Sequence, residues 1–385
     1  MNILAITKFP PIQGGESNKA FYLFNELANR GHKVFVLTNT DDVKEENKSY
    51  FTEEDYKYLS ANDNLKIFNV GVENLPRFIP QFDPKTEKLL NIGLSIITEN
   101  KIDLIYGWYF LPYVSAAYLL SKITSIPFVL QHAGSDLKRI LPTTAFNNYF
   151  NQIIDESAGI LTYHSSASYF PKKETTSLLL QKPNLPNIYT PFGAKADFNK
   201  QYNINRNPDS VFACFGKFSN AKGFYETIDA FKSVKESTLL IFSPNKESMN
   251  LELPDNVFLL KSVAPWKIPE IIRALKAVIV PEWDFGVEIH RSRLSIESVL
   301  CGKPALVSKQ IVDGYSLLKY FMIPIETPNR ESMISRIQYI TQNTSIEENL
   351  LKQNSSLKTM LPTFEEYVNE VENFLFEKSK LTTGH

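Results

Sequence analysis

Short runs of apolar residues recur along the chain, and most are followed by a polar loop and then by apolar residues spaced three or four positions apart. The short runs are typical of parallel strands buried on both faces, and the wider spacing is typical of helices that cover a sheet. This alternation predicts an α/β protein with two doubly wound, Rossmann-like sheets. The predicted strands are residues 3–6, 34–37, 65–70, 104–106, 128–131 and 159–163, and then 211–215, 238–242, 257–260, 277–280 and 305–307.

The length also favours two domains, because 385 residues exceed what one hydrophobic core usually holds. The polar run at 199–210 contains few apolar residues and is the predicted connector. We therefore expect an N-terminal domain at 1–198 and a C-terminal domain at 199–360. The remaining segment, 361–385, contains an amphipathic stretch that predicts a terminal helix.

A candidate ligand-binding turn follows the first predicted strand. The loop contains Gly14 and Gly15, and the helix after it ends at Gly31 and His32, before the next strand. A right-handed βαβ connection puts such a loop at the carboxyl edge of the sheet, where open α/β sheets bind ligands. The dinucleotide fingerprint G-x-G-x-x-G is absent from the sequence. The two glycines therefore fit a simple turn as well as they fit a ligand-binding loop.

A second candidate loop, GKFSNAKG, follows the strand at 211–215 and carries Lys217 and Lys222. Two lysines on a strand-to-helix turn suit a diphosphate, which they neutralise as point charges without fixed geometry. Solvated surface lysines are the alternative interpretation, since lysine is usually exposed.

The most informative stretch is 281–308, where a polar loop leads from a strand into a predicted helix. Ser292 stands at the start of that helix, and Glu297 lies roughly 7 to 8 Å further along its axis. Backbone amides at a helix N-terminus suit a phosphate, and a carboxylate further along suits a ribose. The stretch therefore predicts a nucleotide site, with a plain helix cap and a solvated glutamate as the alternative.

Composition narrows the partners and the compartment. The formal net charge of −1 gives no general argument for nucleic acid or an anionic membrane as the partner, although a local basic patch stays open. Cys214 and Cys301 are the only cysteines and lie in apolar segments, which favours a reducing compartment over a disulfide framework. The start lacks a signal sequence, and no stretch approaches the ~18 apolar residues of a spanning helix. We expect a cytoplasmic protein without a transmembrane segment, for which peripheral membrane contact is still open.

Four stretches occur in a characteristic order: TKFPPIQGGESNKAFYLFNELANRGHKVFVLTN near the start, HAGSDL at 132–137, GKFSNAKG at 216–223, and the strand, loop and helix that end in Glu297. In that order and at that separation, they resemble the retaining family 4 glycosyltransferases of the GT-B fold, over nearly the whole chain. The resemblance implies two Rossmann-like domains that face each other across a cleft, with a terminal helix that crosses back to the first. It also implies sugar transfer from a nucleotide-diphosphate sugar with retention, without a metal or another cofactor. The D-x-D motif of the other main glycosyltransferase fold is absent from the sequence.

The resemblance assigns roles to particular residues. Lys217 and Lys222 match the basic pair that binds the donor diphosphate, with Lys217 where an arginine is more usual. Glu297 matches the second glutamate of the family's E-x7-E element, which binds the ribose hydroxyls. Gly14 and Gly15 match the glycine loop beside the donor phosphates and sugar.

The loop before the helix of Glu297 departs from the family pattern, because Ile289 stands where the first glutamate is expected. That glutamate contacts the donor sugar in the family. Glu288 takes its place if the loop bulges by one residue, and His290 is the alternative. Arg291 and Arg293 are cations that the usual loop lacks; they suit the phosphates or an anionic sugar, or they face solvent.

Residues for catalysis and for the acceptor are expected in the first half. His132 follows a strand at a place where the family often has a histidine near the transferred sugar, and we expect it to donate a hydrogen bond there. Asp136, in a Gly-Ser-Asp turn, is expected to hold its own loop instead. The aromatic run at 106–113 forms either an acceptor surface or part of the core. The acceptor itself stays open among saccharides, lipid-linked glycans, small metabolites and proteins.

Other functions stay open at this point. The divergent loop fits a catalytically silent protein that binds nucleotide sugars or regulates another protein. The GT-B fold also hosts sugar-nucleotide 2-epimerases, which are expected to carry a different set of carboxylates and histidines. A transferase that modifies nucleic acid would need a basic stripe across its acceptor domain, and we do not expect nucleic acid as a partner.

Overall fold

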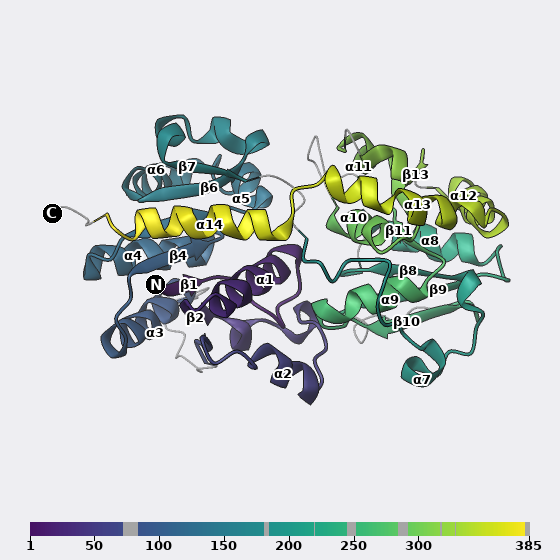
Figure 1. Ribbon diagram of the computed structural model, residues 1–385, viewed down its shortest axis with the longest axis horizontal. Helices are drawn as coiled ribbons and strands as arrows, with labels where there is room; N and C mark the ends of the chain where they lie inside the picture. The colour runs from purple at the N-terminus through teal and green to yellow at the C-terminus, as the bar shows by residue number, and fades with distance from the viewer. Residues whose placement is uncertain are drawn as a thin grey trace. The chain divides into compact units, whose positions relative to one another are not determined.

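The computed structural model describes residues 1–71, 84–180, 185–218, 220–244, 252–283, 292–315, 318–327 and 329–381 (Figure 1). The chain forms two compact units. The first comprises Met1–Lys44, Thr52–Lys182 and Phe364–His385, and the second comprises Glu45–Phe51 and Pro183–Thr363. The polar run at 199–210 thus lies inside the second unit, and the terminal segment belongs to the first.

A seven-stranded parallel sheet forms the centre of the first unit, in the order β3-β2-β1-β4-β5-β6-β7. The strand order reverses between β1 and β4, which is the switch point of a doubly wound sheet. The strands are β1 (Asn2–Ile6), β2 (Lys33–Thr38), β3 (Leu65–Asn69), β4 (Leu104–Trp108), β5 (Phe128–Gln131), β6 (Gly159–Tyr163) and β7 (Ser177–Leu180). The α-helices are α1 (Gly15–Asn29), α2 (Glu53–Leu59), α3 (Lys85–Glu99), α4 (Ser115–Thr124), α5 (Gly134–Arg139), α6 (Asn147–Glu156) and α14 (Phe364–Lys378).

The second unit is built around a six-stranded parallel sheet in the order β10-β9-β8-β11-β12-β13, with its switch point between β8 and β11. The strands are β8 (Val211–Phe215), β9 (Thr238–Ser243), β10 (Val257–Lys261), β11 (Ala277–Val280), β12 (Ala305–Ser308) and β13 (Met322–Ile325). The α-helices are α7 (Phe198–Tyr202), α8 (Phe224–Phe231), α9 (Ile268–Ala274), α10 (Arg293–Leu300), α11 (Lys309–Asp313), α12 (Arg330–Gln342) and α13 (Ser345–Thr359).

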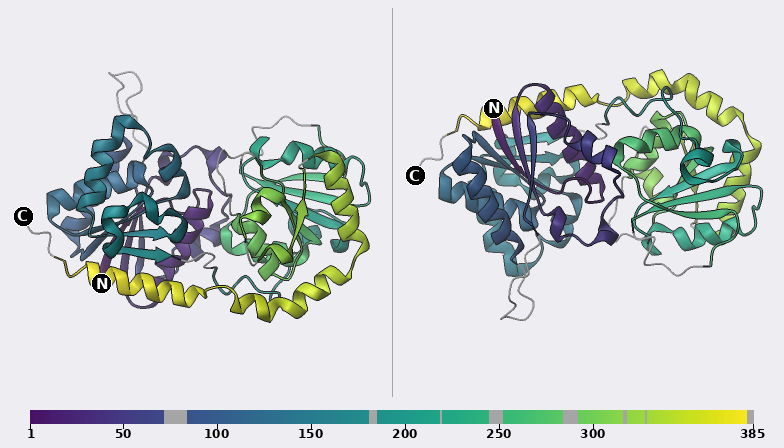
Figure 2. Two further views of the ribbon diagram at one scale, coloured as in Figure 1. Left: turned by 90° about the horizontal axis from the view of Figure 1, so that it is seen from above. Right: turned by 90° about the horizontal axis from the view of Figure 1, so that it is seen from below.

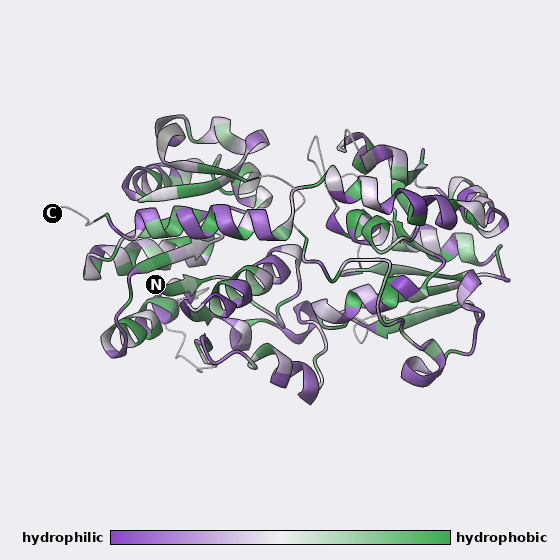
Figure 3. Ribbon diagram, in the orientation of Figure 1, coloured by the Kyte–Doolittle hydropathy of each residue, from purple (hydrophilic) through white to green (hydrophobic). Residues whose placement is uncertain are grey.

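Both sheets are buried on their two faces, which explains why the strands appear as continuous apolar runs in the sequence. In β8, Val211 and Ala213 pack into one core cluster of the second unit, while Phe212 and Cys214 pack into another on the opposite face. The strands are accordingly the most hydrophobic elements of both units (Figure 3). Cys214 and Cys301 are both buried and free.

The predicted fold class is confirmed, because every predicted strand is present within two residues of its expected bounds. Two strands were missed, β7 and β13. Both form the last strand at one edge of their sheet. There they are only partly buried, so their apolar signal is short. β13 also contains Pro324, which is tolerated at a sheet edge because proline has no N–H to donate.

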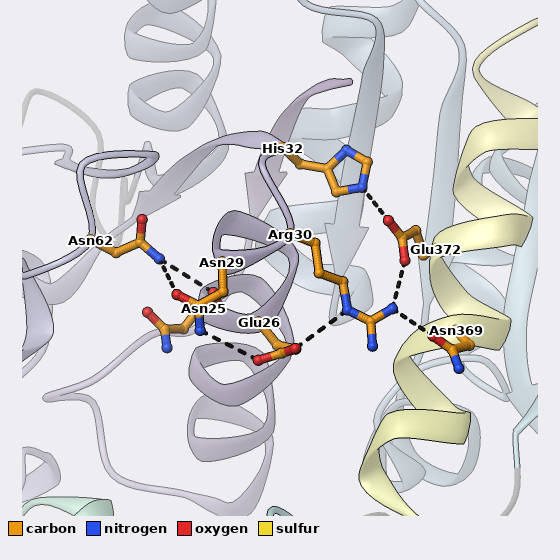
Figure 4. Close-up of polar contacts among 8 residues, drawn as sticks. All are labelled: Asn25, Glu26, Asn29, Arg30, His32, Asn62, Asn369 and Glu372. Atoms are coloured by element: carbon orange, nitrogen blue, oxygen red, sulfur yellow. Dashed lines mark hydrogen bonds and ion pairs between the residues drawn. The ribbon is translucent and has the colours of Figure 1, made fainter.

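The terminal helix α14 packs on the first unit, against α1, β5 and β7, as the different views show (Figures 1 and 2). Val368, Val371 and Leu375 are fully buried on its apolar face. A polar clamp beside this face joins the end of α1 to the helix (Figure 4). Glu372 accepts from Arg30 Nη1 and lies against His32 Nε2, each at 2.6 Å. Arg30 and His32 lie in the Arg-Gly-His turn of the sequence, which therefore holds the terminal helix.

The clamp leads to a prediction for stability at acid pH. Burial alone would raise the pKa of the Glu372 carboxyl, but the hydrogen bonds from His32 and Arg30 lower it below its usual value. A lowered pKa in the folded state stabilises the fold above the ordinary glutamate pKa, and this contribution is lost as the pH falls through the lowered pKa. We expect Glu372→Gln to lower the free energy of unfolding by about 1 kcal/mol at neutral pH, since the clamp is partly exposed.

Urea unfolding of the variant and the wild type between pH 3 and pH 7 measures this difference. The difference should be present above about pH 5 and vanish in acid. Glu370→Gln is the matched control, because Glu370 is an exposed residue of the same helix. A Glu372→Gln effect that persists unchanged at acid pH would contradict the role of the charge.

Candidate functional site

The candidate residues that the structure describes lie in segments that follow the carboxyl ends of strands. In the first unit, Gly14 and Gly15 follow β1, and His132 follows β5. In the second unit, Lys217 and Lys222 follow β8, and α10, which begins just after Ser292, follows β11. This is the edge at which doubly wound sheets bind ligands. Glu288, His290 and Arg291 lie outside the described residues.

The glycine loop of the first unit starts α1. Gly14 is the N-cap residue and has φ +143°, a backbone conformation that favours glycine. One turn into the helix, Lys19 Nζ lies 2.9 Å from Glu16 Oε1 and 3.2 Å from Tyr163 OH, at the end of β6. The start of α1 is thus tied to the same edge of the sheet by side-chain contacts.

His132 is in the interior of the first unit, with 1% of its surface exposed. Its Nε2 lies 2.7 Å from Thr162 Oγ1 on β6, and its ring packs beside Phe170 and Tyr163. The imidazole is therefore held by neighbouring protein groups.

Asp136 joins two loops of the first unit. Its Oδ2 accepts from the backbone N–H of Ala133 at 2.9 Å and from that of Phe110, after β4, at 3.2 Å.

Lys8, which follows β1, lies with its Nζ 4.3 Å from the ring centroid of Tyr109. Burial lowers the pKa of the Lys8 ammonium, and the nearby Asp136 and Glu16 carboxyls oppose that shift. Lys8 was not predicted as a site residue, although its position directly after a strand was a usable signal.

The aromatic run at 106–113 is mostly core. Tyr106, Trp108, Phe110 and Tyr113 are at most 2% exposed. Tyr109 is partly exposed and has φ +83°, which turns the chain out of β4. Tyr109 is therefore the aromatic ring of this run that remains accessible beside Lys8.

The buried carboxyl of Asp136 leads to a second prediction. Burial raises its pKa to about 7 from an ordinary value of 3.8, against the lowering effect of the hydrogen bonds from Ala133 and Phe110. A raised carboxyl pKa means that the folded state loses stability as the pH rises from about 4 to about 7. Asparagine keeps an oxygen acceptor for both backbone amides and does not ionise, so Asp136→Asn should remove this loss, of the order of 2–4 kcal/mol.

The measurement is the urea unfolding of the wild type and Asp136→Asn from pH 4 to pH 8. The free energy of unfolding of the variant should increase relative to that of the wild type as the pH rises. Asp63→Asn, at an exposed residue of the same unit, is the control for losing one carboxylate. If Asp136→Asn is instead the less stable protein at pH 8, then the ionised carboxylate is favourable in the fold and the expected sign is wrong.

The two lysines of the second unit have different surroundings. Lys217 is 45% exposed; its Nζ donates to Asn47 Oδ1 at 2.8 Å and lies 3.5 Å from Glu46. Lys222 is 27% exposed, and its Nζ makes a short contact with Glu282 Oε1. Glu282 was not predicted to lie beside this loop.

The loop of the two lysines is packed directly against the segment that follows β11. The N–H of Trp283 donates to the carbonyl of Ala221 at 3.2 Å. Gly223 has φ +64°, and a Cβ at this position would lie 2.7 Å from the carbonyl oxygen of Pro281. Glycine is therefore required at the start of α8 for two reasons, its backbone conformation and the close approach of Pro281.

Ser292 is the N-cap residue of α10 but makes no side-chain capping hydrogen bond among the described residues. Its carbonyl accepts from Ser295 Oγ at 2.8 Å and from Tyr315 OH at 2.7 Å. Glu297 is 7% exposed, and its Oε1 lies 3.8 Å from Arg293 Nε. Burial raises the pKa of the Glu297 carboxyl, while Arg293 and a hydrogen bond from Tyr189 oppose the rise. Arg293 is thus beside Glu297 in this structure.

Arg273 of α9 is a further residue that was not predicted from the sequence. It is 6% exposed and donates to three backbone carbonyls, those of Ala194 at 2.7 Å, Ile188 at 3.1 Å and Thr190 at 3.3 Å. These carbonyls belong to the segment that contains Tyr189, whose side chain hydrogen-bonds to Glu297. Arginine suits this position because its planar guanidinium presents several donors in fixed directions.

Two general features of the described residues bear on ligands and membranes. Within the described ranges, no group of three or more His, Cys, Asp or Glu side chains is arranged to hold a metal ion. No helix in the same part of the chain is long and apolar enough to cross a bilayer.

No family model and no curated protein matches the sequence. Solved structures do match the fold. Sucrose-phosphate synthase from Thermosynechococcus elongatus aligns with a TM-score of 0.69 and 15% identity, over 98% of each chain. HepE from Anabaena, solved with UDP and glucose, aligns with a TM-score of 0.67 and 15% identity, over 98% of this chain and 99% of HepE. The chain has the GT-B fold.

WaaG, a glycosyltransferase involved in lipopolysaccharide biosynthesis, shares this fold with a TM-score of 0.63 and 13% identity, over all of both chains. HepE has also been solved with UDP-glucose. At these identities the likeness shows the GT-B fold alone, and the roles of the candidate residues stay predictions.

Proposed function

We propose that this GT-B protein is a retaining glycosyltransferase of family 4 that moves a sugar from a nucleotide-diphosphate sugar to a glycan or small-molecule acceptor. The observation that carries the proposal is the pairing of two features at one edge of the second sheet. Lys222 lies in the loop after β8, and Glu297 lies on the helix after the adjacent strand β11. A cation and a carboxylate on neighbouring switch-point segments suit the diphosphate and the ribose of one nucleotide.

In the proposed donor site, Lys217 and Lys222 neutralise the diphosphate together with the backbone amides at the start of α10. Glu297 accepts hydrogen bonds from the ribose hydroxyls. Tyr189 and Arg293 stabilise its carboxylate by a hydrogen bond and by charge, which oppose the effect of burial. The structures of HepE with UDP and with UDP-glucose support a nucleotide sugar as the class of ligand.

The proposed reaction breaks the bond between the anomeric carbon and the diphosphate oxygen, which keeps the electron pair. The acceptor hydroxyl attacks the same face of the sugar, and its proton passes to a phosphate oxygen. The site has to stabilise the charge that develops on the leaving diphosphate, and fixed cations with helix N-termini do this. No protein nucleophile and no metal ion are needed in this scheme.

The acceptor is proposed to bind to the first unit. Lys8 and Tyr109 offer a cation and a partly exposed ring at the carboxyl edge of its sheet. An aromatic ring with polar groups beside it suits a saccharide or another small acceptor, free or linked to a lipid. Nε2 of His132 would contact the transferred sugar after exchanging its contact with Thr162 for one with the ligand.

Donor binding is the first test. We expect UDP, ADP or GDP, or one of the corresponding nucleotide sugars, to raise the thermal unfolding midpoint of the protein with a chelator present. The reason is that the ligand binds the folded state alone. Glu297→Ala should weaken binding of that nucleotide by about tenfold, the value of one or two hydrogen bonds. Glu236→Ala, at an exposed residue of the same unit, should leave the affinity unchanged. Equal affinity of Glu297→Ala and the wild type would contradict the ribose role.

Turnover separates the candidate functions. NMR of the product formed from an α-linked donor should show an α-linkage, and an inverted product would contradict retention. Tight donor binding without transfer to any acceptor would instead favour the silent nucleotide-sugar-binding protein. Conversion of a nucleotide sugar into its C2 epimer without an acceptor would favour the 2-epimerase.

A further inference from the structure

The ion pair between Lys222 and Glu282 is unusual for a lysine that is proposed to bind a diphosphate. Glu282 follows β11, and Lys222 follows the neighbouring strand β8. The ammonium contacts Oε1 of a carboxylate whose side chain is only 7% exposed. The lysine therefore meets any phosphate with a carboxylate already beside it.

The backbone on both sides of the pair is held in place. The carbonyl of Glu282 accepts from Ser308 Oγ on β12 at 2.5 Å, and the next residue, Trp283, donates to the carbonyl of Ala221. Gly223, on the other side of Lys222, is packed against Pro281. Because both backbones are fixed, the carboxylate cannot leave the lysine by a simple movement of one loop.

The two lysines of the loop therefore contribute differently to an anion site. Lys217 is more exposed, and its Nζ donates to a neutral amide oxygen while Glu46 lies further away. The charge of Lys222 is largely cancelled by a buried carboxylate at contact distance. An ammonium has three N–H donors, so Lys222 can hold Glu282 and still donate to a phosphate oxygen.

Resting on the function proposed above, we propose that Glu282 is a positioning residue of the diphosphate site that orients Lys222 and limits the affinity of the site for phosphate. The carboxylate fixes the ammonium at the edge of the sheet. It also competes with a diphosphate for the same ammonium, because an ammonium that is held against a carboxylate has fewer N–H donors to turn toward phosphate oxygens. The site thus favours a nucleoside diphosphate, which gains further contacts such as those of its ribose with Glu297, over pyrophosphate or inorganic phosphate.

Glu282→Gln tests the inference because glutamine keeps the shape and an oxygen acceptor for Lys222 while it removes the negative charge. Isothermal titration with UDP, ADP and GDP, and with inorganic pyrophosphate, should show binding about tenfold tighter in the variant than in the wild type. The gain should be larger at 50 mM than at 500 mM salt, since the attraction that Lys222 regains for the phosphate is electrostatic. General damage to the loop would weaken binding instead.

Glu347→Gln is the matched control. Glu347 holds Lys303, which precedes β12 and so lies at the opposite edge of the same sheet, with Nζ and Oε1 2.5 Å apart. This variant also removes the negative charge that pairs with a lysine of the second unit. We expect its affinity for the same nucleoside diphosphates and pyrophosphate to equal that of the wild type. In a Lys222→Ala background, Glu282→Gln should lose most of its effect if the carboxylate acts through Lys222.

The outcomes are distinguishable. Unchanged or weaker binding by Glu282→Gln, in a wild type that binds a nucleoside diphosphate, overturns this inference and leaves the proposed donor site intact. A full tightening that persists in the Lys222→Ala background overturns the role of the pair. If the wild type binds none of the nucleoside diphosphates, the proposed function and this inference fall together.

Discussion

Burial of both faces of two parallel sheets is the constraint on which the rest of this structure depends. The strands satisfy their backbone hydrogen bonds with one another and offer mainly apolar side chains to the helices on either side. Polar chemistry is thereby confined to the strand ends. The carboxyl ends meet at the switch points between β1 and β4 and between β8 and β11, and the candidate residues gather in the segments that follow such ends.

Confinement to a sheet edge has an electrostatic consequence. The edge is only partly open to solvent, so a charge there loses hydration and is stable mainly beside a partner. The structure shows this three times, in Lys222 with Glu282, in Glu297 with Arg293, and in Lys8 near Asp136 and Glu16. Each group that is suited to a ligand is also held by a protein neighbour. A ligand at such a site would meet groups that already have protein partners.

The sequence was sufficient for the architecture because the fold is encoded in local patterns. A run such as Val211–Phe215 followed by a glycine loop and a helical spacing identifies a strand-to-helix unit without knowledge of its neighbours. The same patterns located Lys222 and Glu297, which follow predicted strands. The patterns failed at the sheet edges, where β7 and β13 are short and half-buried.

What the sequence could not supply is the set of partners, because these come from residues far apart in the chain. Glu282 is 60 positions from Lys222, and Arg273 acts on carbonyls about 80 positions away. No local motif connects such residues; the strand order does, by making β8 and β11 neighbours. A lysine in a strand-to-helix loop is thus only a potential phosphate ligand. Whether its charge is available to a ligand is decided by the loop of the adjacent strand.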